Sequence, residues 1–260
     1  MLPTSGTLVC QTELRRVLGI EAAPVAQWMA QAYQQFENIL SDKGFPCLFG
    51  RRANKSGSCL LLFISRDEER AQLRDGMQAY VKFIHSTALQ KRLFSPLIIL
   101  FEKNDFSSLA HEQAYAWSLL QQLHDDDPGP WPANASKNPE TPEWTYHFDG
   151  VSFFINMSFP GHVAMKSRAL GQHIVFVVNP RENFDEVASA EDESGRRIRQ
   201  KIRQRIAEYN DGVVPETLGF FGDRNSLEWK QYQLHESGGL ALDRCPLHIK
   251  VDKTQALRER

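Results

Sequence analysis

The sequence lacks the features that mark several large classes of protein. It contains no run of 18 apolar residues, so it predicts no membrane-spanning helix. Its first residues, MLPTSGTLVCQTELRR, have no basic start followed by an apolar core, so no signal peptide is predicted. There is also no GxxxxGK loop, GxGxxG turn, GxSxG elbow or HExxH pair. The usual signatures of P-loop, dinucleotide-binding, serine-hydrolase and zinc-hydrolase enzymes are therefore missing.

Cysteine is scarce, and the charge is nearly balanced. Cys10, Cys47, Cys59 and Cys245 lie far apart and form no CxxC pair. This spacing favours a reducing cytoplasm over a disulfide framework or a zinc knuckle. The formal net charge of −2 gives no general reason to expect nucleic acid or a membrane as a partner.

What remains is the composition of an ordinary globular protein, with 42% hydrophobic and 24% charged residues in 260. We expect one domain over residues 1–260, with 1–23 and 252–260 as peripheral tails. The fold class is α/β, in the mixed α+β sense: a single-domain mixed β-sheet flanked by helices. Hydrophobic periodicity predicts helices at 24–41, about 65–90, 107–124 and 191–208. Strands are predicted at 59–64, 96–101, 144–148, 151–156 and 173–178, an extended run at 45–50, and irregular structure over the last 50 residues.

Two of these predictions rest on specific local signals. The continuous apolar runs CLLLFI and PLIILF are typical of strands covered on both faces, so residues 59–101 read as a βαβ unit. Ser65 and Glu68 have the spacing of a capping box for the intervening helix. Asp149-Gly150 is a hairpin turn signal between the strands on either side of it.

The most informative stretch is 153–185, in which a polar loop joins two apolar runs. The loop carries His162, Lys166, Ser167 and Arg168, and Arg181 follows the second run. Arginine forks bind carboxylates in bidentate fashion. A loop of this kind presents an active site about as often as it forms ordinary surface salt bridges, here with Glu182 or Asp185.

Two further residues have both a chemical and a structural interpretation. Cys47 follows a proline and precedes two arginines, which favours a thiolate, although a buried free cysteine is the commoner situation. His124 shares a helix face with Trp117 and Leu120 and is either an axial ligand or a core histidine, and the second is commoner.

The helix at 191–208 is basic and carries Ile198, Ile202 and Ile206 on one stripe. Contact with nucleic acid through 196–205 is one interpretation of it. A solvated helix that docks through its isoleucines is the favoured one, because the chain as a whole is not basic.

An ordered set of motifs resembles the YqcI/YcgG family. These motifs are FPCLFGRRA, LLQQLH with its acidic continuation, WTYHFDGVSFFIN, HVAMKSRALG, IVFVVNPRENFD, EWKQYQL and RCPL, over roughly residues 25–250. The SR-x-LG and NPR-x2-FD segments resemble the YqcI branch. The family includes haem-dependent enzymes that hydroxylate guanidine nitrogens in the D-cycloserine and guanitoxin pathways.

The resemblance implies haem b as cofactor, with an external electron donor or peroxide, and arginine or another guanidino or amine compound as substrate. It implies an iron ligand among His162, His124 and Cys47, the first being favoured. Arg168, Arg181 and Lys166 are expected to hold carboxylates, and Trp117 and Phe154, with Trp144, to line an apolar slot. Asp149, Asp185, Glu182 and 125–127 are the carboxylates available for a guanidinium.

The sequence is also compatible with other interpretations. The same motifs suit a haem-binding or small-molecule-sensing protein without turnover. The oligomeric state is also open, with a homodimer as one option. Apart from substrate and electron donor, no nucleic acid or membrane partner is expected.

Overall fold

The computed structural model describes residues 3–19, 25–103, 105–224 and 226–249, and its strands form one six-stranded mixed sheet. The strand order is β1-β2-β3-β6-β5-β4. Strands β2 (Leu60–Ile64) and β3 (Leu97–Phe101) are parallel, whereas β6 (Val175–Pro180) is antiparallel to both β3 and β5 (Val151–Ser158). Strand β4 (Tyr146–Phe148) completes one edge. The predicted mixed α+β architecture is confirmed.

Two hydrophobic cores lie on opposite faces of this sheet. On one face, α4 (Glu69–Ser86), α6 (Leu109–Asp125) and α9 (Trp229–Tyr232) pack around even-numbered side chains of β2 such as Leu62. On the other face, α1 (Gln11–Leu18), α2 (Gln27–Ser41) and α3 (Leu48–Ser56) pack on odd-numbered ones such as Phe63. Continuous apolar runs in β2 and β3 follow from this double coverage, since both strand faces are buried.

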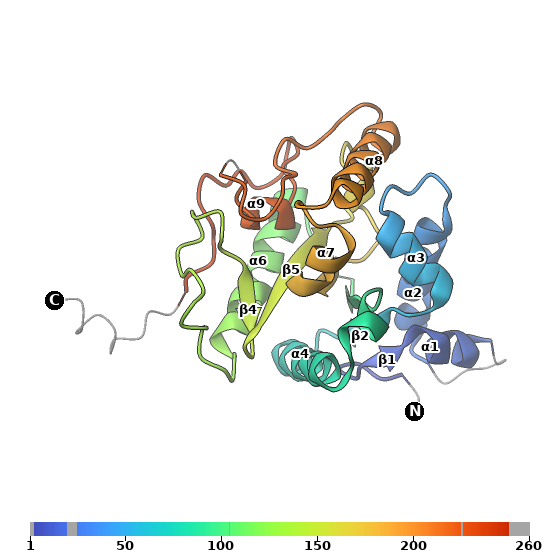
Figure 1. Ribbon diagram of the computed structural model, residues 1–260. Coiled ribbons are helices and arrows are strands. Elements are labelled where there is room, and N and C mark those ends of the chain that lie inside the picture. Colours follow the sequence, from blue (N-terminus) through green and yellow to red (C-terminus); the bar gives the residue numbers. More distant parts are fainter. Residues whose placement is uncertain (1–2, 20–24, 104, 225, 250–260) are drawn as a thin grey trace.

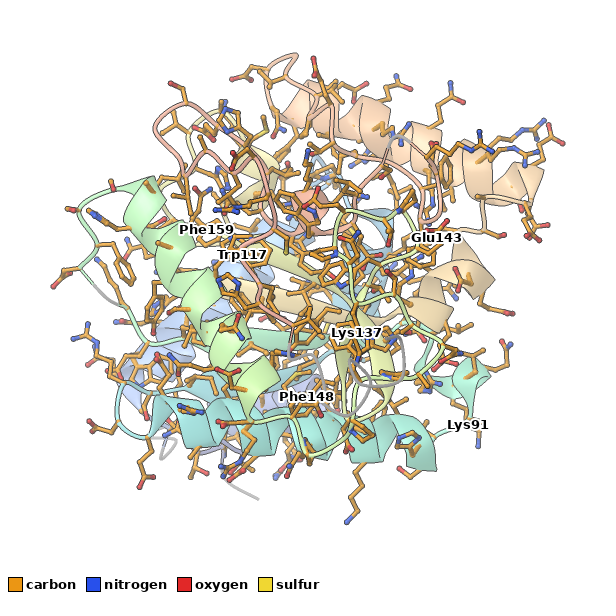
Figure 2. The ribbon with its side chains drawn as sticks, turned by 90° about the vertical axis from the view of Figure 1, so that its left-hand side faces the viewer. Lys91, Trp117, Lys137, Glu143, Phe148 and Phe159 are labelled. Atoms are coloured by element: carbon orange, nitrogen blue, oxygen red, sulfur yellow. The ribbon has the colours of Figure 1, made fainter. Side chains whose placement is uncertain are left out.

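The basic helix α8 (Glu193–Tyr209) lies beside the α3 side of the molecule, and α7 (Arg181–Val187) lies between α8 and the sheet (Figure 1). Figure 2 shows Trp117 and Phe159 in the interior and Lys91 at the surface. No helix in the described part of the chain is long and apolar enough to cross a membrane.

The hairpin between β4 and β5 is confirmed together with its turn. Asp149 and Gly150 both have positive φ, 49° and 75°, as the two-residue turn that suits strand twist requires. The parallel pair β2 and β3 with α4 between them confirms the βαβ unit.

Several local predictions were wrong. Residues 45–50 are not one extended run, because α3 begins at Leu48 with Cys47 as its N-cap. The Ser65–Glu68 capping box does not form. Helix α4 starts at Glu69, and the Ser65 hydroxyl donates to the Asp67 carbonyl instead. That helix also ends earlier than expected, at Ser86, with a separate short helix α5 (Leu89–Arg92) after it.

The described part of the predicted N-terminal tail, 1–23, contains β1 (Val9–Cys10) and α1. Strand β1 pairs antiparallel with β2, and Leu14 of α1 is fully buried. Pro24, where the helix at 24–41 was expected to start, and the tail 252–260 lie outside the described residues.

Candidate functional site

A cavity of about 240 Å³ lies between the α2–α3 face of the sheet and helix α8. Its floor is built by neighbouring side chains of β5 and β6, because Phe154 pairs with Asn179 and Asn156 with Val177. The wall from the N-terminal half includes Phe36, Leu40, Phe45, Pro46, Cys47, Phe49 and Cys59, and the opposite wall includes Phe184, Arg199, Ile202, Arg203, Ile206 and Leu218. The lining is therefore mainly apolar, with a few polar groups directed from the sheet.

Cys47 occupies the start of α3 at the edge of this cavity. Its Sγ accepts a hydrogen bond from the backbone N–H of Gly50 at 3.3 Å, as an N-cap does. Burial raises the pKa of the thiol, while the N–H groups of Gly50 and Phe49 and the charge of Arg168 act in the opposite direction. Burial is the larger effect, so the pKa stays above its usual value, and a cation bound near the sulfur would shift the balance toward the thiolate.

Cys59 is a second cysteine in the cavity lining, and it is less suited to chemistry. Cys59 immediately precedes β2 and is 1% exposed, and burial raises the pKa of its thiol to about 12. The structure thus brings two thiols to one cavity, of which Cys47 is the more exposed.

Helix α8 directs two arginines at the cavity. Arg199 and Arg203 share one helix face with Ile202 and Ile206, at spacings of three and four residues. Arg203 Nη2 donates to the Leu218 carbonyl at 2.6 Å, and Arg199 Nε donates to the Ala188 carbonyl at 2.8 Å. Burial, with the nearby Arg181 and Arg203 charges, lowers the pKa of Arg199 to about 10.

Arg168 also lines the cavity, but its guanidinium is largely committed to the backbone. Nη1 donates to the carbonyls of Tyr232 at 3.0 Å and Met157 at 3.3 Å, and Nη2 donates to the Gln231 carbonyl at 2.9 Å. Burial lowers its pKa to about 9. Arg168 therefore ties β5 to the α9 segment and adds positive charge next to Cys47.

The charge in the cavity lining is of one sign. Its described residues include three arginines and neither aspartate nor glutamate. None of the carboxylates considered for guanidinium binding, namely Asp149, Asp185, Glu182 and 125–127, is among the lining residues. Such a lining favours the carboxylate end of a ligand, while the side-chain amides of Asn156 and Asn179 offer neutral acceptors.

His162 does not line this cavity and is instead paired with Glu236. Its Nδ1 is 2.8 Å from Oε2 of Glu236, and its buried Nε2 has no hydrogen-bond partner. Glu236 also accepts from the backbone N–H groups of Val163, Ala164 and Met165 at 2.8–2.9 Å. Burial raises the pKa of Glu236, but these donors and His162 outweigh burial and lower it. The carboxylate thereby holds the polar loop in place.

The family model for the YqcI/YcgG family matches residues 36–248, a segment that contains every residue lining this cavity. The chain belongs to the YqcI/YcgG family. Three relatives align over most of their length. A Streptomyces lavendulae protein described as putative N(omega)-hydroxy-L-arginine synthase DcsA is 37% identical over 227 residues, covering 86% of this chain and 85% of that protein.

The other two relatives are from Bacillus subtilis (strain 168). YqcI is 25% identical over 84% of this chain and 87% of its own length, and YcgG is 28% identical over 85% of this chain and 88% of its own. Both are described as uncharacterized. No solved structure matches the chain.

Of the residues that the YqcI/YcgG resemblance suggested, only some meet at the cavity. Cys47, Arg168 and Phe154 line it. Lys166 instead pairs with Asp211 at the surface, and Trp117 packs in the other core, where its Nε1 donates to Gln233 Oε1 at 2.7 Å.

Arg181 and His124 also lie away from the cavity lining. Arg181 pairs with the buried Glu228 and covers the ring of Phe221. His124 is buried against Trp131, with ring centroids 5.6 Å apart. Trp144, a further slot candidate, is fully buried in the same core as Trp117.

Sequence reasoning missed Arg199, Arg203, Asn156 and Asn179. The spacing of the two arginines relative to Ile202 and Ile206 was visible, but it was assigned to a solvated face. In the described residues no group of three or more His, Cys, Asp and Glu side chains is arranged to hold a metal ion.

Proposed function

We propose that this protein is an oxygenase that hydroxylates a guanidine nitrogen of an arginine-like substrate, with a haem held in the cavity by Cys47. The observation that carries the proposal is that Cys47, alone among the three candidate ligands His162, His124 and Cys47, lines a largely apolar cavity together with arginines. The name of the Streptomyces lavendulae relative supports the choice of substrate and reaction.

The residues present fit the chemistry of a haem. A haem needs one axial side chain, apolar surroundings and cations near its carboxylates, and Cys47, the phenylalanines and the arginines of the lining supply these. The cavity is smaller than the range of about 300–1,000 Å³ common for ligand sites. We therefore expect the wall made by α8 and Leu218 to open when a cofactor of this size enters.

When bound, haem would supply the activation of dioxygen or peroxide that oxygen transfer to nitrogen requires. An external reductant is needed when dioxygen is used.

The protein's own residues would orient the substrate and set its protonation state. Arg199 or Arg203 would hold the substrate carboxylate, and Asn156 and Asn179 would accept hydrogen bonds from the guanidine. With cations and no carboxylate in the lining, the pKa of a bound guanidinium is lowered, because like charges disfavour the charged form. The neutral guanidine has the available nitrogen lone pair that oxidation requires.

The deciding test combines spectroscopy with product analysis. Protein purified after growth with a haem precursor should show a Soret band, and its ferrous-CO band should lie far to the red, as for a thiolate ligand. C47A should lose that red-shifted band, whereas C245A, which alters a cysteine outside the cavity, should keep it. C59S distinguishes the two cavity thiols and should also keep it.

Turnover is tested on the same preparation. Incubation with L-arginine and a reductant or peroxide should add one oxygen atom to the substrate, detected by mass spectrometry. A normal haem spectrum without any oxygenated product across guanidino compounds and amines would instead support a haem sensor. A ferrous-CO band unchanged in C47A would contradict the assignment of the ligand.

A further inference from the structure

Three aromatic rings lead from the cavity wall toward the surface. Phe154, which lines the cavity, contacts Tyr232 edge-on at a centroid distance of 5.6 Å. Tyr232 lies 6.2 Å from Trp144, and Trp144 stacks on Trp131 at 6.4 Å. Tyr232 and Trp144 are fully buried, whereas Trp131 is half-buried. Tyr232, Trp144 and Trp131 are called the aromatic relay here.

The phenol of Tyr232 has a proton acceptor within hydrogen-bond distance, which favours its one-electron oxidation. Its oxygen lies 2.8 Å from Oε1 of the buried Glu228, an arrangement in which the hydroxyl donates to the carboxylate. Arg181 pairs with the other carboxylate oxygen and balances its charge. A phenol that loses an electron becomes strongly acidic, and an adjacent carboxylate can take the proton without any movement of the chain.

We propose that the aromatic relay discharges oxidising equivalents that form in the cavity when no substrate is present. This inference rests on the proposed oxygenase function. Tyr232 gives one electron to the oxidant in the cavity and its phenolic proton to Glu228. Trp144 then passes one electron to the Tyr232 radical, which takes its proton back from Glu228, and Trp131 passes one electron to Trp144, so the electron vacancy reaches Trp131.

At the surface the cycle closes. A one-electron reductant from solvent, of the enediol or reduced-flavin class, returns an electron to Trp131. In total, the oxidant in the cavity gains one electron and the external reductant loses one. The relay would thereby protect a cavity whose floor and walls are rich in oxidisable thiol and aromatic groups.

The chain provides matched controls. Trp28 is half-buried like Trp131, but the rings it contacts belong to Phe63 and His173. Tyr115 donates to the carboxylate of Glu69, as Tyr232 does to Glu228, and its ring contacts Phe106. Neither residue lines the cavity. W28F and Y115F should therefore leave the relay intact.

The first experiment does not require haem. Azide radicals generated by pulse radiolysis oxidise tryptophan in the full chain, and the tryptophan and tyrosyl radical absorptions are followed in time. Radiolysis introduces the electron vacancy at the surface end, so transfer runs along the relay in the reverse direction: the tryptophan signal should decay as the tyrosyl signal rises, at a rate independent of protein concentration. When an oxidant forms in the cavity, removal of the vacancy at Trp131 by the external reductant draws it outward instead. Y232F should abolish most of this rise and W131F should reduce it several-fold, whereas W28F and Y115F should preserve it. A rise that persists in Y232F would overturn the proposal.

The second experiment uses haem-loaded protein with peroxide and no substrate. Oxidised residues are located by peptide mass spectrometry, and haem bleaching is followed optically. Wild-type protein should accumulate oxygen on Trp131, and Y232F should lose this modification and bleach several-fold faster. If wild type and Y232F bleach at the same rate, and Trp131 stays unmodified in the wild type, the relay is contradicted.

These two experiments separate the relay from the proposed function. If the chain binds no haem, the oxygenase proposal fails, but the radiolysis result still tests electron transfer along the relay. Circular dichroism verifies that each variant is folded. If Y232F does not fold, W144F replaces it, because that substitution interrupts the relay between its two ends and should abolish transfer from Trp131.

Discussion

Nδ1 of His162 and Oε2 of Glu236 lie 2.8 Å apart although the residues are separated by 74 positions. Because Glu236 also accepts three backbone N–H groups of the loop, the pair fixes the segment that precedes Arg168. We therefore infer that His162, which pairs with a buried carboxylate and does not line the cavity, holds this loop in place and is not an iron ligand.

We predict that H162A destabilises the fold without removing haem. Loss of one hydrogen bond to a charged group costs about 1.5–3 kcal/mol, and the unfolding free energy measured in urea should fall by about that amount, because Glu236 keeps its three backbone N–H donors. The Soret band of the folded protein should remain. The exposed H85A is the control and should change neither quantity, and loss of the Soret band in folded H162A would restore His162 as ligand.

Acid should weaken the fold before the carboxylates protonate. Burial lowers the pKa of His162, His147 and His173 below the usual 6.5, so the unfolded chain binds more protons than the folded chain as the pH drops. The stabilisation is complete above about pH 6.5 and is lost as the pH falls through the folded values. Urea unfolding between pH 8 and 5, roughly the range in which His titrates, measures it.

The histidines can be separated in that experiment. H173N removes one of the three buried histidines and should make the fall in unfolding free energy with decreasing pH less steep. H85N changes an exposed histidine and serves as the control. A fold that becomes more stable on acidification over the same range would contradict the prediction.

Arg168 should behave as a structural residue more than as a substrate anchor. R168Q removes donors from three backbone carbonyls, and each buried polar group left without a partner costs about 1–3 kcal/mol. We expect an unfolding free energy lower by about 3 kcal/mol in total. K166Q, at an exposed ion pair two residues away, should change stability by less than about 0.5 kcal/mol. Unchanged stability in R168Q would contradict this assignment.

Arg203 should recognise the carboxylate of the substrate. A hydrogen bond to a charged group contributes about 1.5–3 kcal/mol, so R203Q should raise the KM for arginine about 10- to 100-fold. Agmatine, which lacks the carboxylate, should bind wild type and R203Q equally. R197Q changes an exposed arginine on the same helix and is the control. If R203Q raises the KM for arginine and for agmatine by the same factor, Arg203 acts on the cavity in general and the prediction is wrong.

Helix α8 should respond if haem binds as proposed, because a cofactor of that size would require the cavity to enlarge. Amide hydrogen exchange of residues 193–209 should change on haem loading, while exchange in the α4 segment, on the other face of the sheet, should not. Identical exchange in α8 with and without haem would place the cofactor elsewhere.

The sequence by itself determined the elements whose signals are local. The hairpin follows from Asp149 and Gly150 because two adjacent residues must adopt positive φ there. Strands β2 and β3 follow from uninterrupted apolar runs, and α6 follows from its periodicity, with Ser108 as its cap. Such signals extend over a few residues, and the physics that produces them does not depend on the rest of the chain.

The tertiary structure alone decided which side chains meet. Cys47 lies in the cavity lining together with Phe154 and Arg168 because α3 packs on the face of the sheet from which β5 and β6 line the cavity. Arg199 and Arg203, for which a solvated face was predicted, line the cavity because α8 packs over the sheet. Arg168 donates hydrogen bonds to backbone carbonyls that lie 11 to 64 residues away in the sequence. Contacts of this kind depend on the packing of distant segments, and no periodicity or spacing within one segment encodes them.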